Sequence, residues 1–319
     1  MDALRGLIES ELRGGSAQEA ATYRVYTHEY DVVETPPVDR HFDHRRELAS
    51  LGRYVSPLVR RLLRTLIGRR ERRWLSDKTR GSLDGGRLHR LCTGRSGRIF
   101  RQKVVSDGGP TACTLLLDLS SSMSGDQIEL CRRLALLFGE TLERLSFPTE
   151  IIGFSTDDRD LRDDIGRQTG QTHEEISALY TRLVPLRHVV FKTFREPWRA
   201  AAGRLGRVEC LSLTPLGESL LFAGRRLAAM PEKRKVLLCL TDGQPVVGTP
   251  DEIVTFEHAR AAVERLARSG IEPVGIGIAE PSVRSIFPRS AVIHTLQDLP
   301  GSFLKELSAA LTQAGGSHA

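Results

Sequence analysis

Oxygen-bearing side chains follow an apolar run near the middle of the chain. The run 112–117 ends at Asp118, and Ser120 and Ser122 follow at alternate positions. A helical pattern of apolar residues then begins after Gly125. This order predicts a buried strand, a polar loop at its carboxyl end and an amphipathic helix. One carboxylate with two nearby hydroxyls is an all-oxygen donor set, which suits a hard divalent cation such as Mg²⁺.

Two later segments offer further oxygen donors. Thr214 lies just before a helical pattern, and Asp242 follows the apolar run 235–240 and precedes Gly243. Each feature also has a purely structural explanation. Thr214 followed by proline is typical of a helix N-cap, as is Ser122 before the earlier helix, and Asp242 before a glycine is typical of a turn. No one of these residues indicates a binding site by itself.

The elements that must position these side chains alternate between strands and helices. We expect strands at 112–117, 150–155, 235–240, 271–278 and 291–296, and an extended segment at 23–33. We expect helices at 42–73 (kinked or split at Pro57), 128–142, 174–180, 197–205, 216–230, 256–268 and 302–311, with a surface insertion at 156–170. This alternation predicts an α/β fold with a mostly parallel sheet covered on both faces. Ligands of such sheets bind at the carboxyl ends of the strands.

The composition is that of an ordinary soluble protein. Of 319 residues, 40% are hydrophobic and 27% are charged, and the net charge is +6. No apolar run approaches the ~18–20 residues of a transmembrane helix. The segment 1–13 carries Glu9 and Glu11, which argues against a signal peptide. The five cysteines are scattered without a Cys-x-x-Cys pair, which is typical of reduced thiols. We therefore predict a cytoplasmic protein that contacts no membrane.

Arginine is concentrated in the first third of the chain, where the residues are Arg60, Arg61, Arg64, Arg69, Arg70, Arg72, Arg73, Arg80, Arg87, Arg90, Arg95, Arg98 and Arg101. A solvated face, a docking surface for an acidic partner or a nucleic-acid surface would each account for this group. Few aromatic residues beyond Trp74 and Phe100 accompany the arginines, and no nucleic-acid-binding motif is present. We keep nucleic acid as the weaker alternative.

The three oxygen-bearing segments, in this order and on this α/β pattern, resemble the metal-ion-dependent adhesion site of the von Willebrand factor A domain. The resemblance covers roughly residues 111–311 and implies a Rossmann-like fold. It implies that Ser120 and Ser122 bind the ion directly, and that Asp118, Thr214 and Asp242 bind it directly or through water. Few direct carboxylate contacts leave the ion electrophilic, so a carboxylate of a partner completes its coordination.

A second resemblance covers most of the chain. The segments 23–27, 72–74, 81–88, 153–156 and 183–199 are similar to the T subunit of the aerobic cobaltochelatase. In that family the A-domain subunit works with a hexameric AAA+ ATPase. A third, large chelatase subunit holds the porphyrin-like ring that receives Co²⁺. The resemblance therefore implies a part in ATP-dependent cobalt insertion into a corrinoid precursor.

Other readings of the same residues are weaker. An aspartyl-phosphate enzyme using Asp118 as nucleophile usually has a second aspartate where Ser120 stands. No Gly-x-x-x-x-Gly-Lys-Ser/Thr loop is present, so the chain is not expected to bind ATP in that manner. The histidines of the first third (His28, His41, His44 and His89) lack ligand-like spacing apart from His41 and His44. An extracellular adhesion module fits poorly with unpaired cysteines.

These observations lead to one prediction of organisation and function. A basic, mainly helical region at 1–109 precedes an A domain at 110–319. The protein acts as a non-catalytic, Mg²⁺-dependent adaptor for a MoxR-type AAA+ ATPase, of the cobaltochelatase T-subunit kind. The alternative is an A-domain partner of an AAA+ ATPase that activates another metalloenzyme, of the nitric-oxide-reductase-activation type.

Overall fold

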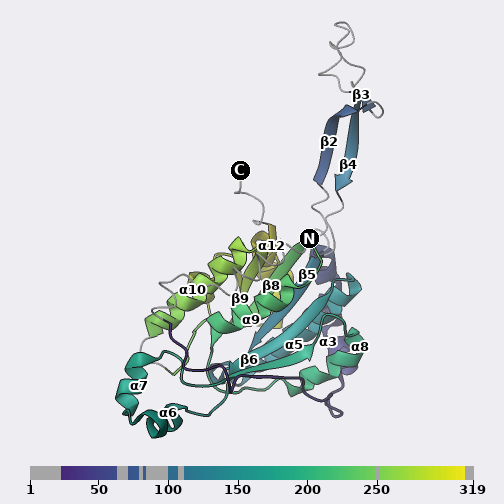
Figure 1. Cartoon of the computed structure of the whole chain (residues 1–319). Helices are drawn as coiled ribbons and strands as arrows, with labels where there is room; N and C mark the ends of the chain where they lie inside the picture. The colour runs from purple at the N-terminus through teal and green to yellow at the C-terminus, as the bar shows by residue number, and fades with distance from the viewer. Residues whose placement is uncertain are drawn as a thin grey trace.

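The computed structural model describes residues 23–62, 71–78, 82–83, 100–106, 111–248 and 252–312. Its centre is a seven-stranded sheet in the order β1-β7-β6-β5-β8-β9-β10 (Figure 1). The strands are β1 (Val32–Glu34), β5 (Thr111–Asp118), β6 (Thr149–Thr156), β7 (Leu186–Lys192), β8 (Arg234–Thr241), β9 (Ile271–Ile278) and β10 (Ser290–Ile293). Only β6 and β7 pair antiparallel among the neighbouring strands of this sheet in the described chain. The predicted α/β fold with a mostly parallel sheet is therefore confirmed.

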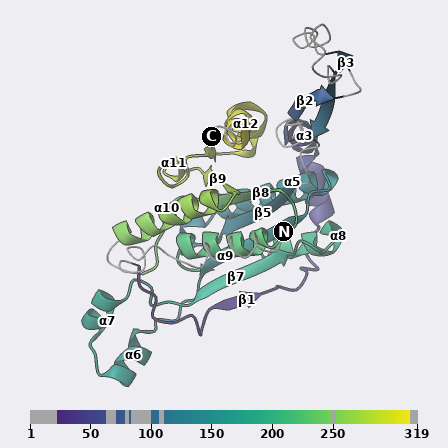
Figure 2. The ribbon, with the colours of Figure 1, turned by 45° about the horizontal axis from the view of Figure 1, so that its top comes forward.

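Helices cover both faces of the sheet (Figures 1 and 2). They are α3 (His44–Leu62), α5 (Asp126–Arg144), α6 (Arg162–Thr169), α7 (His173–Leu179), α8 (Trp198–Ala201), α9 (Leu216–Ala228), α10 (Glu252–Arg268), α11 (Val283–Ile286) and α12 (Leu304–Thr312). One core contains buried residues of α3, α5 and α12, and the other contains buried residues of α9, α10 and α11. The two cores lie on opposite faces, so the sheet is the middle of three layers.

Strand β5 shows why this sheet is the centre of the domain. All eight of its residues are buried. Leu115 and Leu117 belong to the core on the α5 face, whereas Ala112 and Leu116 belong to the core on the α9 face. Successive side chains of a strand point to opposite faces, so a continuous apolar run is what a doubly covered strand requires. This is the apolar run before Asp118 from which the sequence analysis predicted a buried strand.

The predicted helix at 42–73 corresponds in the described residues to helix α3. Helix α3 spans His44–Leu62, and Pro57 lies inside it without interrupting the helix. Leu51, Val55 and Leu58 are buried on the side that packs on α5. This burial on both sides of the proline outweighs the hydrogen bond that proline removes. Arg72 and Arg73, predicted to be helical, lie instead in strand β2 (Glu71–Lys78).

Four of the described segments before residue 110 are strands. β2 pairs antiparallel with β4 (Phe100–Ser106), which also pairs with β3 (Ser82–Leu83). β1 belongs to the main sheet, where it pairs parallel with β7. The sheet thus takes in a strand that lies before the predicted boundary between 109 and 110. The arginines at 64, 69, 70, 80, 87, 90, 95 and 98 lie outside the described residues.

The predicted surface insertion after β6 contains a helix that the sequence analysis did not anticipate. Helix α6 places Leu161 and Ile165 one helical turn apart, and both are buried with Ile176 and Leu183. Side chains four residues apart share one helix face, so two apolar residues suffice to fold an otherwise charged segment onto α7. The insertion is a small folded unit with its own apolar cluster (Figure 2).

No described helix is long and apolar enough to cross a membrane. The four cysteines in the described residues, Cys113, Cys131, Cys210 and Cys239, are free, as predicted.

Candidate metal-binding site

Asp118 ends strand β5 and is completely buried. Its Oδ1 accepts a hydrogen bond from the backbone N–H of Ser120 at 2.9 Å, and its Oδ2 accepts one from the Thr241 hydroxyl at 2.6 Å. Burial and, to a smaller extent, the neighbouring Asp242 raise the pKa of the Asp118 carboxyl to about 7, against the opposing effect of these hydrogen bonds. The carboxylate is therefore held in one orientation in surroundings that disfavour its charge.

The two serines of the first segment lie beside this carboxylate and run from the interior to the surface. The Ser120 residue is 1% exposed, whereas Ser122 is exposed to solvent. Their hydroxyl oxygens lie 3.0 Å apart. A short 3₁₀ helix, Ser121–Met123, begins here, and the backbone between the serines turns outward. The pair of hydroxyls thus extends from the buried end of the segment to the protein surface.

Asp242 follows β8, the strand that pairs directly with β5. It is 6% exposed, and its proximity to Asp118 contributes to the raised pKa of Asp118. The backbone N–H of Gln244 donates to Asp242 Oδ1 at 3.3 Å, so the carboxylate also supports the turn that follows. Gly243 has φ +81°, and a β-carbon there would lie 2.8 Å from the backbone nitrogen of Val283. Glycine is therefore required at this turn.

Thr214 lies on the loop before α9 and is 3% exposed. Its N–H donates to the carbonyl of Val246 at 2.8 Å, and the Val246 N–H donates back to the Thr214 carbonyl at 3.0 Å. This bridge ties the Thr214 loop to the loop that carries Asp242. The N-cap position of α9 is occupied by Pro215, without a side-chain capping bond. The helix-capping explanation of Thr214 is therefore wrong.

A second set of hydrogen bonds joins the Thr214 loop to the first segment. The Ser121 N–H donates to the Ser212 carbonyl at 2.8 Å, and the Leu211 N–H donates to the Leu119 carbonyl at 2.6 Å. The structure thus joins Asp118, Ser120 and Ser122 by hydrogen bonds, places Asp242 close to Asp118, and holds Thr214 on a loop bonded to both neighbouring segments.

Sequence reasoning missed the contributions of Thr241 and Ser155. The Thr241 hydroxyl donates to Asp118 and accepts from the Gly243 N–H at 3.0 Å. The Ser155 hydroxyl donates to the Leu213 carbonyl at 2.7 Å and accepts from the Ser212 N–H at 3.0 Å. Both residues carry a hydroxyl and lie at or near the carboxyl end of a strand. That position in the sequence could have indicated their contribution to the site.

The donor set fits a hard divalent cation. The neighbouring Asp242 makes ionisation of Asp118 more costly, and a cation between the two carboxylates would remove that cost. Hydroxyls and carboxylates are the oxygen ligands that Mg²⁺ accepts. In the described residues no group of three or more His, Cys, Asp and Glu side chains is placed to hold a metal. A cation here therefore depends on serine and threonine as well as aspartate, and the histidines described in the first third form no such group.

Comparison with known proteins now identifies the family. A family model described as "Cobalamin biosynthesis protein CobT VWA domain" matches residues 83–313. This chain belongs to that family. The von Willebrand factor A fold and the kinship with the cobaltochelatase T subunit, both expected from the sequence, are confirmed at the level of the family.

Relatives in several bacteria share the same region with this CobT-type chain. Protein NorD of Stutzerimonas stutzeri is 28% identical over 70% of this chain and 35% of its own length. The uncharacterized protein YojO of Bacillus subtilis is 24% identical over 70% of this chain and 32% of its own length. The uncharacterized protein PA0525 of Pseudomonas aeruginosa is 32% identical over 52% of this chain and 25% of its own length. The chain thus spans about a third or less of each of these relatives.

Solved structures with a similar arrangement include a von Willebrand factor type A protein from Catenulispora acidiphila. It has a TM-score of 0.39 and 16% identity, and the match covers 68% of this chain and 45% of that chain. The pilus adhesin SpaC from Lactobacillus rhamnosus GG has a TM-score of 0.44 and 15% identity, and the match covers 64% of this chain and 30% of that chain.

Proposed function

We propose that this chain is a metal-dependent docking subunit with no catalytic activity of its own. Mg²⁺, or another divalent cation, would be held by Asp118, Ser120, Ser122, Thr214 and Asp242. The bound ion supplies an electrophilic position at the surface that accepts a carboxylate of a partner. The chain's own residues fix the donors, bury the two carboxylates and keep one side of the site open to solvent.

One observation carries this proposal. Asp118 and Asp242 end neighbouring parallel strands as buried carboxylates that interact unfavourably, and the exposed Ser122 leads from them to the surface. Uncompensated buried charges are costly, so such a pair is retained where a cation is bound. The exposed side explains why a partner can reach the ion, whereas a purely structural ion would be enclosed.

The partner that fits this chain best is a MoxR-type AAA+ ATPase. Membership of the CobT A-domain family supports this assignment. ATP-driven motion of the ATPase would pass through the docked carboxylate to a client. In the cobaltochelatase reading, the client is a large chelatase subunit that inserts Co²⁺ into a corrinoid precursor in the cytoplasm.

A second function is supported by the similarity to protein NorD of Stutzerimonas stutzeri. In this alternative the same ATPase-linked docking serves the activation of a different metalloenzyme. The metal site and the ATPase are common to both functions, and only the client differs. A neighbouring gene for a large chelatase subunit would favour cobalt insertion, whereas an ATPase gene alone would favour the alternative.

The proposal is tested by binding of the MoxR-type ATPase encoded nearest to this chain, with and without EDTA. We expect Mg²⁺-dependent association, and at least tenfold weaker association for Asp118→Ala and for Asp242→Ala. Glu264→Ala, at an exposed position of α10, is the matched control and should bind normally. Circular dichroism should show that all variants fold. Association that is insensitive to EDTA and to both aspartate substitutions would refute metal-dependent docking.

A further inference from the structure

The loop that leads to Thr214 has no regular structure of its own. Residues 208–213 of the described chain form neither helix nor strand. Leu211, Ser212 and Leu213 are nevertheless half-buried, and Thr214 is only 3% exposed. Backbone N–H and C=O groups that are withdrawn from water need hydrogen-bond partners. The partners of this loop therefore determine where Thr214 lies.

The last two side chains of β6 supply three of these partners. The Ser155 hydroxyl donates to the Leu213 carbonyl at 2.7 Å and accepts from the Ser212 N–H at 3.0 Å. The Thr156 hydroxyl oxygen accepts from the Leu213 N–H at 3.1 Å. Ser155 is 0% exposed and Thr156 is 1% exposed, so water does not compete for these bonds. Two side chains of one strand thus hold the backbone immediately before Thr214.

The hydroxyl of Ser155 is committed to this loop. A serine hydroxyl has one proton and two lone pairs. The Leu213 carbonyl can only accept, so the Ser155 proton lies on that side, and the Ser212 N–H can only donate, so it uses one of the lone pairs. Ser155 therefore acts on the proposed metal site through the loop and is not itself a ligand.

The carboxyl end of β6 also adjoins the segment that carries Asp118. β6 pairs parallel with β5, and Phe154 is the register partner of Asp118. The Leu119 N–H donates to the Phe154 carbonyl at 3.0 Å. Ser155 follows Phe154 directly, so one strand end contacts both segments. Ser155 thus fixes the Thr214 loop relative to the strand that ends at Asp118.

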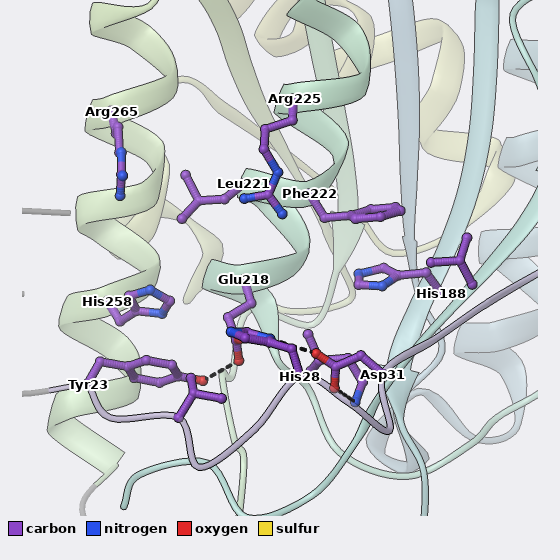
Figure 3. Close-up of a pocket in the computed structure, with 13 residues that line it drawn as sticks. Tyr23, His28, Asp31, His188, Glu218, Leu221, Phe222, Arg225, His258 and Arg265 are labelled. Atoms are coloured by element: carbon purple, nitrogen blue, oxygen red, sulfur yellow. Dashed lines mark hydrogen bonds and ion pairs between the residues drawn. The ribbon is translucent and has the colours of Figure 1, made fainter. Parts of the chain in front are cut away.

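The chain after Thr214 is fixed by other groups. Helix α9 begins two residues later, and Glu218 in its first turn accepts a hydrogen bond from the Tyr23 hydroxyl at 2.8 Å (Figure 3). Glu218 Oε2 also lies 2.8 Å from Nε of Arg182. Tyr23 and Arg182 therefore hold the helix that follows Thr214, whereas the β6 hydroxyls hold the residues that precede it.

We propose that Ser155, assisted by Thr156, is a positioning residue for the metal ligand Thr214. This rests on the proposed metal-dependent function, because it assigns to Ser155 the placement of a ligand within that site. Without the Ser155 hydroxyl, two backbone groups of the loop lose their partners, and the loop moves to regain them. The movement displaces Thr214 from Asp118 and weakens cation binding. Residues that orient a metal ligand through hydrogen bonds typically change metal affinity about 10–100-fold when they are substituted.

The proposal is tested by isothermal titration calorimetry of MgCl₂ into the full chain after EDTA treatment and dialysis. Ser155→Ala should raise the Kd for Mg²⁺ at least tenfold, and Thr156→Val, which keeps the side-chain shape and loses one hydrogen bond, about threefold. The matched control is Thr149→Val at the opposite end of β6. Thr149 is 2% exposed, and its hydroxyl donates to the Phe147 carbonyl at 2.8 Å. This control should bind Mg²⁺ within twofold of wild type.

The outcomes separate the positioning role from the metal site itself. Unchanged affinity in both Ser155→Ala and Thr156→Val, or an equal loss in Thr149→Val, would overturn the positioning role and leave the metal site intact. Wild type that binds no divalent cation would overturn the proposed function and this proposal with it. Thr156→Val keeps the test decisive if Ser155→Ala does not fold.

Amide hydrogen exchange in EDTA provides a readout that does not depend on metal. The Thr214 and Val246 N–H groups donate to each other's carbonyls and not to Ser155. If Ser155 positions Thr214, both amides should exchange at least tenfold faster in Ser155→Ala than in wild type or Thr149→Val. Faster exchange confined to the Ser212 amide would show that Ser155 only satisfies its own partners, and the proposal would fail.

Discussion

Two regions of this molecule hold a pair of largely buried carboxylates, and they stabilise them in different ways. Near α9, Asp31 and Glu218 both lie against Arg182, whose side chain is 1% exposed. At the ends of β5 and β8, Asp118 and Asp242 are surrounded by hydroxyls and backbone N–H groups, and the proximity of Asp242 raises the pKa of Asp118. The first pair is complete within the chain. We propose that the second pair instead takes its positive charge from a bound cation.

This difference separates a structural ion network from a binding site. A buried guanidinium paired with two carboxylates stabilises the folded chain only while every member is present. A pair of carboxylates held only by neutral donors has no opposite charge within the protein, so its ionised form is costly until a cation binds. Substitutions in the two regions should therefore change the free energy of unfolding by different amounts, which the following predictions use.

The largest effect is expected from Arg182→Met. The substitution keeps much of the side-chain volume but leaves Asp31 and Glu218 without their shared cation. Breaking a buried ion pair from one side costs about 3–5 kcal/mol. Urea unfolding should show this loss in the free energy of unfolding. Arg167→Met, at a side chain that is 76% exposed, is the control and should change stability by less than about 1 kcal/mol. A loss as small as that of the control would mean that the Arg182 network is not structural.

The Arg182 region should also weaken in acid through His188. Burial above all, together with the nearby Arg225, Arg182 and Arg226, lowers the pKa of His188 to about 4, against an opposing effect of Asp31. The unfolded chain takes up the proton near pH 6.5, so the stability due to neutral His188 is lost as pH falls from about 6.5 toward 4. The loss reaches at most about 3 kcal/mol.

The comparison that isolates this effect is wild type against His188→Gln. Gln keeps a hydrogen-bonding group near the Ser219 hydroxyl, which lies 3.1 Å from His188 Nε2. The difference in unfolding free energy between the two proteins should depend on pH between 4 and 6.5 and be constant above pH 7. A constant difference across the whole range would show that His188 is not held neutral.

Divalent cation should stabilise the protein through the Asp118 and Asp242 region alone. Ligand that binds only the folded state stabilises it by RT ln(1 + [L]/Kd), which is about 2.7 kcal/mol at a hundredfold excess over Kd. Thermal unfolding with MgCl₂ should therefore show a higher midpoint for wild type and for Arg167→Met. The midpoint of Asp242→Ala should not respond. An equal response in Asp242→Ala would place the cation elsewhere.

The sequence predicted the architecture well because the relevant signals are local. The apolar run before Asp118 and the helical periodicity of α9 and α10 can be recognised from residues that are neighbours in the sequence. The strand partner of β1 and the helix α6 were not foreseen, since their stability comes from contacts distant in sequence, such as β1 with β7. Helix α3 passes through Pro57 for the same reason, because tertiary burial overrides a local penalty.

The two carboxylate pairs differ in the same respect. The sequence suggested Asp118 and Asp242 as metal ligands because each comes at the end of an apolar strand. Both also match the pattern of the metal-ion-dependent adhesion site. The Arg182 network could not, because Arg182 and Asp31 are 151 positions apart and nothing in the local sequence of either residue indicates the other. Charged groups that meet only through the tertiary fold carry no such local signal.

The smallest change in stability is expected from Asp118→Asn in protein stripped of divalent cation. The substitution removes one of two interacting buried charges, and the amide oxygen can still accept a hydrogen bond in place of the carboxylate. The relief of charge repulsion and desolvation therefore opposes the loss of one charged acceptor, so the free energy of unfolding should fall by no more than about 1 kcal/mol or should rise. Chemical unfolding in EDTA measures this change in the free energy of unfolding, with Arg182→Met unfolded under the same conditions for comparison. A loss of several kcal/mol would mean that the Asp118 carboxylate is a structural group like those held by Arg182, and the distinction between the two regions would fail.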